Sequence, residues 1–319
     1  MTQGGAPGPV LGAPQRRLGE KAIRIALIAA AAISLLTTLG IVLSLAGETI
    51  LFFTEGSLTR GGDPTQPVGI FEFLFGTTWA PQATPEPSLG VLPLITGTFV
   101  VSAIALVVAI PLGLATAVYL AEYASKRVRG AVKPVIELLA GIPTIVFGFF
   151  ALVFFTPLLK SIGIELESFN ALSAGVIMGF MVLPTIASLS EDAMRAVPTS
   201  LREGSFGLGA SRLQTATRIV FPAALSGIVA SIVLGVSRAV GETMIVLIAG
   251  GIQPNFSLNP TISLETMTAF IANTGKGDIP ASTVQFKAIF AVGALLFLIT
   301  LVMNAISIRF VRKYRQVYE

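Results

Sequence analysis

The chain has 319 residues, of which 53% are hydrophobic and only 12% are charged, and its mean hydropathy is +0.83. Soluble globular chains carry roughly 25% charged residues, so this composition indicates an integral membrane protein. The chain has no cysteine and no histidine, which excludes disulfides, thiolate nucleophiles, Cys/His metal sites and triads that need an imidazole. The formal net charge is +4.

Six stretches are long and apolar enough to cross a bilayer, whose hydrocarbon core of about 30 Å needs roughly 20 residues in a helix. They lie at about residues 25–47, 94–120, 136–159, 169–190, 223–249 and 288–308. Because they lack the alternation of barrel strands, they predict an all-α, polytopic membrane protein with six transmembrane helices. The first stretch also fits a signal peptide cleaved after Ser44-Leu45-Ala46, but its apolar run is longer than usual for one, so we expect an uncleaved helix.

Basic residues gather in the segment before the first predicted helix and in those after the second, fourth and sixth. By the positive-inside rule, this alternation predicts a multi-pass protein with both termini cytoplasmic. The basic residues then face membrane lipid, and no nucleic-acid partner is expected. We expect a disordered cytoplasmic N-terminus over residues 1–20, a transmembrane domain over 21–312 and a cytoplasmic tail over 313–319.

Two connections on the predicted external side are long. Residues 48–90 include the apolar segment Val68–Phe75 and then Trp79. These residues lie either at the membrane interface, with the indole at headgroup depth, or in a plug packed over the helices. Residues 250–285 contain an apolar stripe within Pro260–Asn273 that predicts a short helix, either a docking surface or a lid.

Three prolines and Glu137 predict further features of the second, third and fourth helices. Pro111, Pro143 and Pro184 are expected to interrupt the second, third and fourth helices, and broken helices often line a pathway. Glu137 follows Pro134 and is expected in the first turn of the third helix, where a carboxylate is favourable.

The predicted cytoplasmic loop 191–221 is longer than a connection needs. Ser200–Glu203 and Ser211–Gln214 each fit a capping box. Gly207 and Gly209 between them permit a sharp reversal of the chain. The loop therefore predicts two short helices joined by a glycine turn, too small to bury a core of their own.

This loop resembles the E-A-A-x3-G-x9-I-x-L-P loop of bacterial ABC-importer permeases. The matching residues are Glu203, Gly204, Ser205, Gly209, Ile219 and Pro222, with Phe221 at the leucine position. Gly204 and Ser205 replace the two alanines. In that family the loop forms a coupling helix seated in a groove of the ATPase subunit, so the resemblance implies an ATPase-coupling role for the six matching residues.

Other segments are similar to phosphate permeases of the PstC type. They are Phe75–Trp79, Leu89–Thr98, Ile110–Gly113, Tyr119–Tyr123, Leu139–Thr144 and Ser237–Met244. The resemblance covers roughly residues 20–312. It implies a type I ABC-importer permease fold in the bacterial plasma membrane and a subunit of an inorganic phosphate importer. The implied partners are a PstA-like permease subunit, two PstB-like ATPase subunits and an external phosphate-binding protein.

The chain has no G-x-x-x-x-G-K-[ST] phosphate-binding loop for ATP. ATP and Mg are therefore expected on the partner ATPase subunits, and this chain is not expected to be an enzyme. We identify no catalytic residue, metal ligand or cofactor site in it.

Arg238 and Glu242 lie within the fifth predicted helix, where a continuous helix would place them on one face about 6 Å apart. They are interpreted either as a structural ion pair or as part of the translocation path. In the second interpretation, which we favour, Arg238 contacts the oxyanion and Glu242 keeps the contact from becoming too tight. A ridge of small residues beside them should let another helix approach closely. It consists of Gly227, Ser231, Gly235 and Ala239.

Two alternatives remain open. A permease for another oxyanion, such as sulfate or molybdate, fits the same residues, because an arginine does not distinguish among tetrahedral anions. A membrane sensor or scaffold that does not transport is the less favoured alternative, and it would need no contact with an ATPase.

Overall fold

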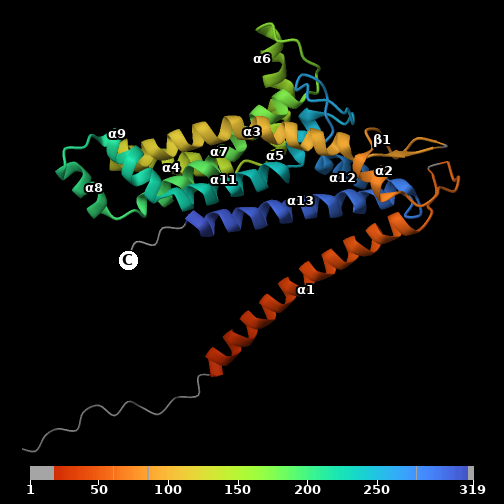
Figure 1. Ribbon diagram of the computed structural model, residues 1–319, viewed down its shortest axis with the longest axis horizontal. Coiled ribbons are helices and arrows are strands. Elements are labelled where there is room, and N and C mark those ends of the chain that lie inside the picture. Colours follow the sequence, from red (N-terminus) through yellow and green to blue (C-terminus); the bar gives the residue numbers. More distant parts are fainter. Residues whose placement is uncertain (1–17, 60, 85, 278, 315–319) are drawn as a thin grey trace, which may run out of the picture. The chain divides into compact units, whose positions relative to one another are not determined.

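The computed structural model describes residues 18–314 except 60, 85 and 278 (Figure 1). The expected disordered N-terminus and the expected tail fall almost wholly outside these residues. The chain divides into two units, Met1–Gly47 and Glu48–Glu319. The first contains most of a long apolar helix, and the second contains the packed bundle in which all the candidate sites lie.

The described elements are helices and short π-helical segments (η), with one small hairpin. In chain order they are α1 (Leu18–Thr54), α2 (Ile70–Phe75), β1 (Trp79–Ala80), β2 (Ser88–Leu89), α3 (Leu92–Val118), η1 (Tyr119–Tyr123), α4 (Lys126–Ala140), α5 (Thr144–Phe150), η2 (Ala151–Phe155), α6 (Thr156–Ser161), α7 (Ala171–Arg195), α8 (Thr199–Gly207), α9 (Arg212–Thr215), η3 (Ala216–Val220), α10 (Phe221–Ala223), α11 (Leu225–Val240), η4 (Val246–Gly250), α12 (Met267–Gly275) and α13 (Val284–Tyr314).

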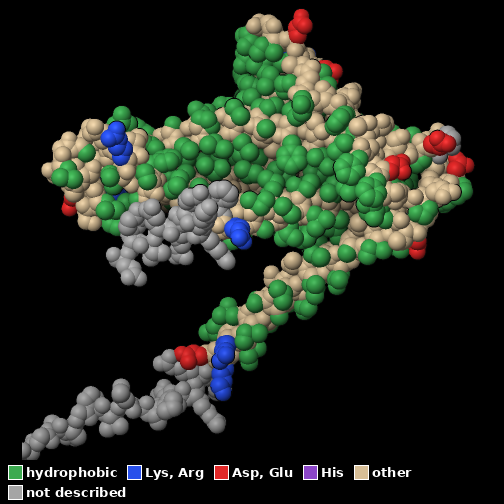
Figure 2. Space-filling view, viewed as in Figure 1, with side chains coloured by type: hydrophobic (Ala, Val, Ile, Leu, Met, Phe, Trp, Pro, Cys, Tyr) green, Lys and Arg blue, Asp and Glu red, His purple; other side chains and the backbone are tan. Residues whose placement is uncertain are grey.

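Among the described residues, five helices are long and apolar enough to cross a membrane, and the number rises to six if one bent pair forms a single span. The five span residues 20–54, 92–123, 144–161, 171–195 and 284–309. The bent pair joins residues 212–223 to α11 at an angle of 72°. The expected all-α, multi-span fold is confirmed. Figure 2 shows hydrophobic side chains over most of the middle of the larger unit, as expected for a surface that faces lipid.

Helix α7 is the centre of the larger unit, with α3 and α11 packed along it (Figure 1). Small residues allow this close packing. A Cβ added to Gly175 of α7 would lie 2.7 Å from the Ile104 Cβ of α3, which is too close for van der Waals contact. The surrounding core includes Met178, Met181 and Ile186, all fully buried.

The ridge of small residues predicted on α11 packs against α7. A Cβ on Gly235 would lie 2.9 Å from the Ile186 Cδ1, and the Ser231 and Ser190 hydroxyls are 2.7 Å apart. The prediction of a close helix contact at this ridge is confirmed. The contact packs α11 closely against α7 beside Arg238.

The expected third helix, 136–159, is interrupted. Helix α4 ends at Ala140, and α5 begins after Pro143, whose ψ of 133° is extended. A residue before proline avoids the helical region, so the chain turns at Gly141–Pro143. Glu137 lies far from the start of α4, where Ser125 is the N-cap and accepts from the Val128 N–H at 3.3 Å. The expectation that Glu137 begins a helix is therefore wrong.

The other two prolines do not break their helices. Pro111 lies inside α3 and Pro184 inside α7, and both helices continue through them. The expected interruption is confirmed only at Pro143. Neighbouring helices pack on both sides of α7, and such packing lets a helix tolerate a missing hydrogen bond.

We call the end of the larger unit that carries α8 and α9 the elbow end, and the opposite end, with α2, β1, β2 and α12, the loop end (Figure 1). At the loop end Trp79 is 3% exposed and meets Phe270 of α12 edge to face, with ring centroids 4.9 Å apart. The expected indole exposed at headgroup depth is therefore wrong, and Trp79 and Phe73 pack into the protein as a plug would. Ile70, Phe71 and Phe75 of the same segment are exposed, so the segment packs only along one side. The predicted short helix is present as α12.

The backbone after β2 approaches the end of α2 so closely that it requires glycine. A Cβ on Gly90 would overlap the backbone of Gly76. We expect Gly90→Ala to destabilise the protein by about 1–3 kcal/mol, because neither backbone segment can move aside. Thermal unfolding of the purified protein in detergent measures this. Gly130→Ala in α4 is the control, because its Cβ would meet nothing within 4 Å. Equal unfolding temperatures for the two variants would contradict the prediction.

Candidate functional site

The elbow is formed by α8, a turn and α9. Ser211 and Gln214 form the predicted capping box, with the Ser211 N–H donating to the Gln214 Oε1 at 2.8 Å and the Gln214 N–H to the Ser211 Oγ at 3.3 Å. Gly209 has a φ of +82°, as the predicted glycine reversal requires. The capping box predicted at Ser200 is wrong, because Pro198 is the N-cap of α8 and Ser200 lies inside the helix.

The six residues of the predicted coupling motif have different environments. Glu203, Gly204, Gly209 and Pro222 are exposed, Ile219 is half-buried, and Ser205 is buried. The hydroxyl groups of Ser205 and Thr215 are 2.9 Å apart and join α8 to α9. Sequence reasoning missed Leu208, which is 91% exposed between the two helices. An apolar side chain this exposed at a rigid turn is suited to insertion into a partner protein.

Arg202 anchors the elbow to the bundle. Its Nε and Nη2 donate to the Glu122 Oε1 at 3.1 and 3.0 Å, at the end of the helix formed by α3 and η1. Its Nη2 and Nη1 also donate to the backbone oxygens of Met194 and Val197, at 2.7 and 2.6 Å. One side chain thus joins α8 to both α3 and α7. Sequence reasoning missed it, although a glutamate at the end of a predicted span was an available signal.

A second ionic cluster holds α4 on α7. Glu191 is fully buried and accepts from the Arg129 Nε at 2.6 Å and the Lys133 Nζ at 2.7 Å. Lys133 also pairs with Asp192. Arg195 is a third cationic partner, with its Nε 3.7 Å from the Glu191 Oε1. The buried carboxylate is thus compensated, and the cluster orders the elbow end.

Arg238 and Glu242 do not share a helix face. Helix α11 ends at Val240, and Gly241 is its C-cap. The Glu242 Oε1 accepts from the backbone N–H groups of Met244 and Ile245, at 2.9 and 3.3 Å, and so caps the helical segment after the break. No ion pair joins Arg238 to Glu242 in the described part of the chain. The assumption of one continuous helix was wrong at Gly241.

Arg238 points toward α7 instead. Its Nε donates to the Met181 Sδ at 3.0 Å, and its Nη1 reaches the Thr185 Oγ1 at 3.5 Å. Both acceptors are weak, the side chain is half-buried, and its Nη2 makes no hydrogen bond to any described residue. The break therefore lies beside a guanidinium with donors still available for an anion.

Comparisons with known proteins identify the family and the fold to which the chain belongs. Residues 109–316 match the family model "Binding-protein-dependent transport system inner membrane component". The chain is 33% identical to the "Probable ABC transporter permease protein YqgH" of Bacillus subtilis (strain 168), over 93% of this chain and 91% of that protein. It is 34% identical to the "Phosphate transport system permease protein PstC 1" of Mycobacterium tuberculosis (strain ATCC 25618 / H37Rv), over 70% of this chain and 72% of that protein.

Solved structures show the same fold. A bacterial ABC transporter involved in the import of the acidic polysaccharide alginate gives a TM-score of 0.63 at 17% identity, covering 94% of this chain and 100% of that chain. The MetNI methionine ABC transporter gives 0.54 at 21% identity, covering 71% of this chain and 95% of that chain. The chain belongs to the family of binding-protein-dependent transport system inner membrane components.

Proposed function

We propose that this permease subunit of an ABC importer is of the PstC type and forms the path for inorganic phosphate. A permease component of this family is not itself catalytic and has no cofactor, and the ATPase lies in partner subunits. The observation that carries the proposal is Arg238, a half-buried guanidinium near the end of α11, the helix that counts as a sixth span only together with residues 212–223. It has no carboxylate partner among the described residues. The PstC-named relative supports phosphate as the anion.

The predicted orientation assigns the two ends of the bundle to the two sides of the membrane. In this proposal the elbow end lies in the cytoplasm and the loop end outside. The basic residues of 191–221 support this orientation by the positive-inside rule. The proposed partners at the elbow are two PstB-like ATPase subunits, which contact Glu203 and the exposed turn at Leu208. A PstA-like permease subunit completes the path, and an external phosphate-binding protein delivers the anion to the loop end.

Arg238 is suited to a transient phosphate contact. A guanidinium presents several donors in one plane, which match the oxygens of a phosphate. The Met181 thioether and the Thr185 hydroxyl position the guanidinium but do not neutralise its charge. Glu242 stabilises the break in the helix after α11, because its carboxylate caps the next helical segment. In this proposal Glu242 shapes the path and does not pair with Arg238.

The contacts also define a route by which ATP-driven motion at the elbow reaches the path. Movement of α8 is passed through Arg202 to the backbone at Met194, near the end of α7. Helix α7 carries Met181 and Thr185, which contact Arg238. A shift of α7 therefore changes the position of the guanidinium. Opening and closing of the ATPases would in this way alternate its access to the two sides.

Uptake by the whole transporter tests the proposed substrate. Proteoliposomes that contain both permeases, the ATPases and the binding protein should accumulate labelled phosphate only with ATP. Excess unlabelled phosphate should abolish uptake of the label, whereas equal excesses of sulfate and molybdate should not. Equal competition by sulfate or molybdate would favour a permease for another oxyanion. No ATP-dependent uptake of any of the three anions would favour a sensor or scaffold.

A further inference from the structure

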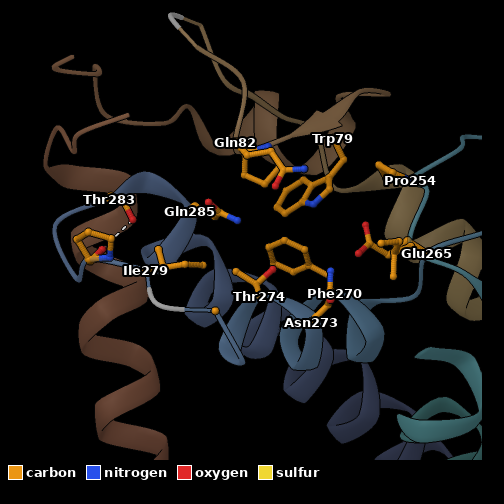
Figure 3. A pocket seen from close by; sticks show the side chains of 14 residues that line it. Trp79, Gln82, Pro254, Glu265, Phe270, Asn273, Thr274, Ile279, Thr283 and Gln285 are labelled. Atoms are coloured by element: carbon orange, nitrogen blue, oxygen red, sulfur yellow. Dashed lines mark hydrogen bonds between the residues drawn. The ribbon is translucent and has the colours of Figure 1, made fainter. Parts of the chain in front are cut away.

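A cavity of about 290 Å³ lies at the loop end, away from Arg238 and the elbow (Figure 3). Segments distant in sequence meet around it, namely the β1 hairpin, residues 252–254, α12 and the start of α13. Its lining residues are aromatic, aliphatic or polar and neutral, apart from one carboxylate. The aromatic and amide side chains that line it are Trp79, Phe270, Gln82, Asn273 and Gln285. The volume is at the lower limit for small-molecule pockets and suits a single long side chain.

The one carboxylate is that of Glu265, which is 5% exposed. Its backbone N–H donates to the Gln253 carbonyl at 2.9 Å, but its carboxylate has no hydrogen bond or ion pair with any described residue. Figure 3 shows this carboxylate directed into the cavity. Burial raises the pKa of Glu265 to about 8. Without a cation this buried carboxyl group stays largely protonated at neutral pH, and a cation from outside the described residues would stabilise its ionised form.

The described chain offers no cation to the cavity. No lysine or arginine lies among its lining residues. Lys287 on α13 pairs with Glu55 at 3.9 Å. Lys276, after α12, is exposed and lines a different cavity together with Glu167, whose carboxylate accepts from the Ser263 N–H at 2.9 Å. A partner for Glu265 must therefore come from outside the described residues.

The remaining features of the cavity suit an arginine on a peptide. Trp79 and Phe270 form an aromatic wall, and a guanidinium stacks well on such faces. The Trp79 Nε1 is buried without an acceptor in the described chain. An inserted peptide supplies both missing groups, because its arginine can donate to Glu265 and its backbone carbonyl can accept from the indole. A free inorganic anion would accept from the indole but would not supply the cation that Glu265 lacks.

We infer that this cavity is the socket for an arginine side chain of the external binding protein, with Glu265 as its counter-ion. The inference rests on the proposed function for the assignment of the loop end to the external side. The charge of the surrounding segments agrees with it, because acidic residues outnumber basic residues in the connections at this end and favour a cationic partner surface. Among the described residues of 48–90 and 250–287, the acidic residues are Glu48, Glu55, Asp63, Glu72, Glu86 and Glu265, and the basic residues are Lys276 and Lys287.

Docking of the binding protein tests the socket directly. The complete transporter in lipid nanodiscs is titrated with the labelled binding protein, and the Kd is measured. We expect Glu265→Gln to raise the Kd about tenfold or more, because the arginine would lose a buried charge-assisted hydrogen bond. Glu86→Gln, which removes the same charge from an exposed position at the same end, should raise the Kd by less than about threefold.

A small arginine analogue tests whether the cavity itself binds the arginine side chain, or whether only the overall negative charge of this end attracts the binding protein. N-acetyl-arginine amide should compete with the binding protein for the wild-type transporter and lose this effect with Glu265→Gln, whereas the neutral citrulline analogue should not compete. An unchanged Kd for Glu265→Gln, or a change no larger than for Glu86→Gln, would overturn the inference. Phosphate uptake is measured separately at saturating binding protein, so failure of the socket is distinguishable from failure of the phosphate assignment.

Discussion

Replacing Arg238 with alanine is expected to reduce ATP-driven phosphate uptake by about 10- to 100-fold at limiting phosphate. The loss corresponds to a hydrogen bond between a charged donor and an oxyanion, worth about 1.5–3 kcal/mol in a protein. Because Arg238 has only the weak acceptors Met181 and Thr185 in the described chain, its removal leaves no buried carboxylate without a partner. The variant should therefore fold and assemble normally. Initial uptake rates in proteoliposomes measure the loss.

Lysine at position 238 is the matched variant. It keeps the charge but lacks the planar fork, so its uptake should lie between those of the wild type and the alanine variant. Thr185→Val, which removes only the weak hydroxyl contact at 3.5 Å, should leave uptake within about twofold of the wild type. Wild-type uptake by Arg238→Ala would exclude Arg238 from the path and leave it a purely structural residue.

Hydropathy predicted the membrane-spanning character of the chain well, because lipid contact requires long apolar runs whatever their neighbours are. The breaks within these runs were harder to predict. Pro143 ends a helix, whereas Pro111 and Pro184 do not. Burial does not explain the difference, because Pro184 is buried whereas Pro111 and Pro134 are exposed inside unbroken helices. At Pro143 the break begins at Gly141, the C-cap of α4.

In the candidate site, too, a local feature was predicted correctly from the sequence, whereas contacts between distant residues were not predicted. The Ser211–Gln214 capping box is local, and it formed as predicted. The pairing of Arg238 with Glu242 assumed an unbroken helix, and the Glu242 carboxylate instead satisfies the N–H groups freed by the break. The contact between Glu122 and Arg202 joins residues 80 positions apart, and neither residue alone indicates the other. Periodicity cannot find such a pair.

Replacing Arg202 with alanine is expected to uncouple ATP hydrolysis from transport. The side chains of Arg202 and Glu122 are only 16% and 7% exposed, and removing one partner of a buried pair costs about 3–5 kcal/mol. The elbow would lose its hydrogen bonds to Glu122 and to the backbone at Met194. We expect at least about a tenfold loss of phosphate uptake, by the conversion of about 1.4 kcal/mol per tenfold in rate. The ATPases should continue to hydrolyse ATP.

The control is Arg127→Ala, which removes an exposed basic residue from α4 at the same end of the bundle. Its ratio of phosphate transported to ATP hydrolysed should equal that of the wild type. Glu122→Gln should lower the ratio as Arg202→Ala does, and the double variant should be little worse than either single variant, because both remove one interaction. Fully additive losses would mean that the two residues act separately. A normal ratio for Arg202→Ala would mean that force from the elbow reaches α7 by another contact, such as the packing of α11 on α7 through Ser231 and Gly235.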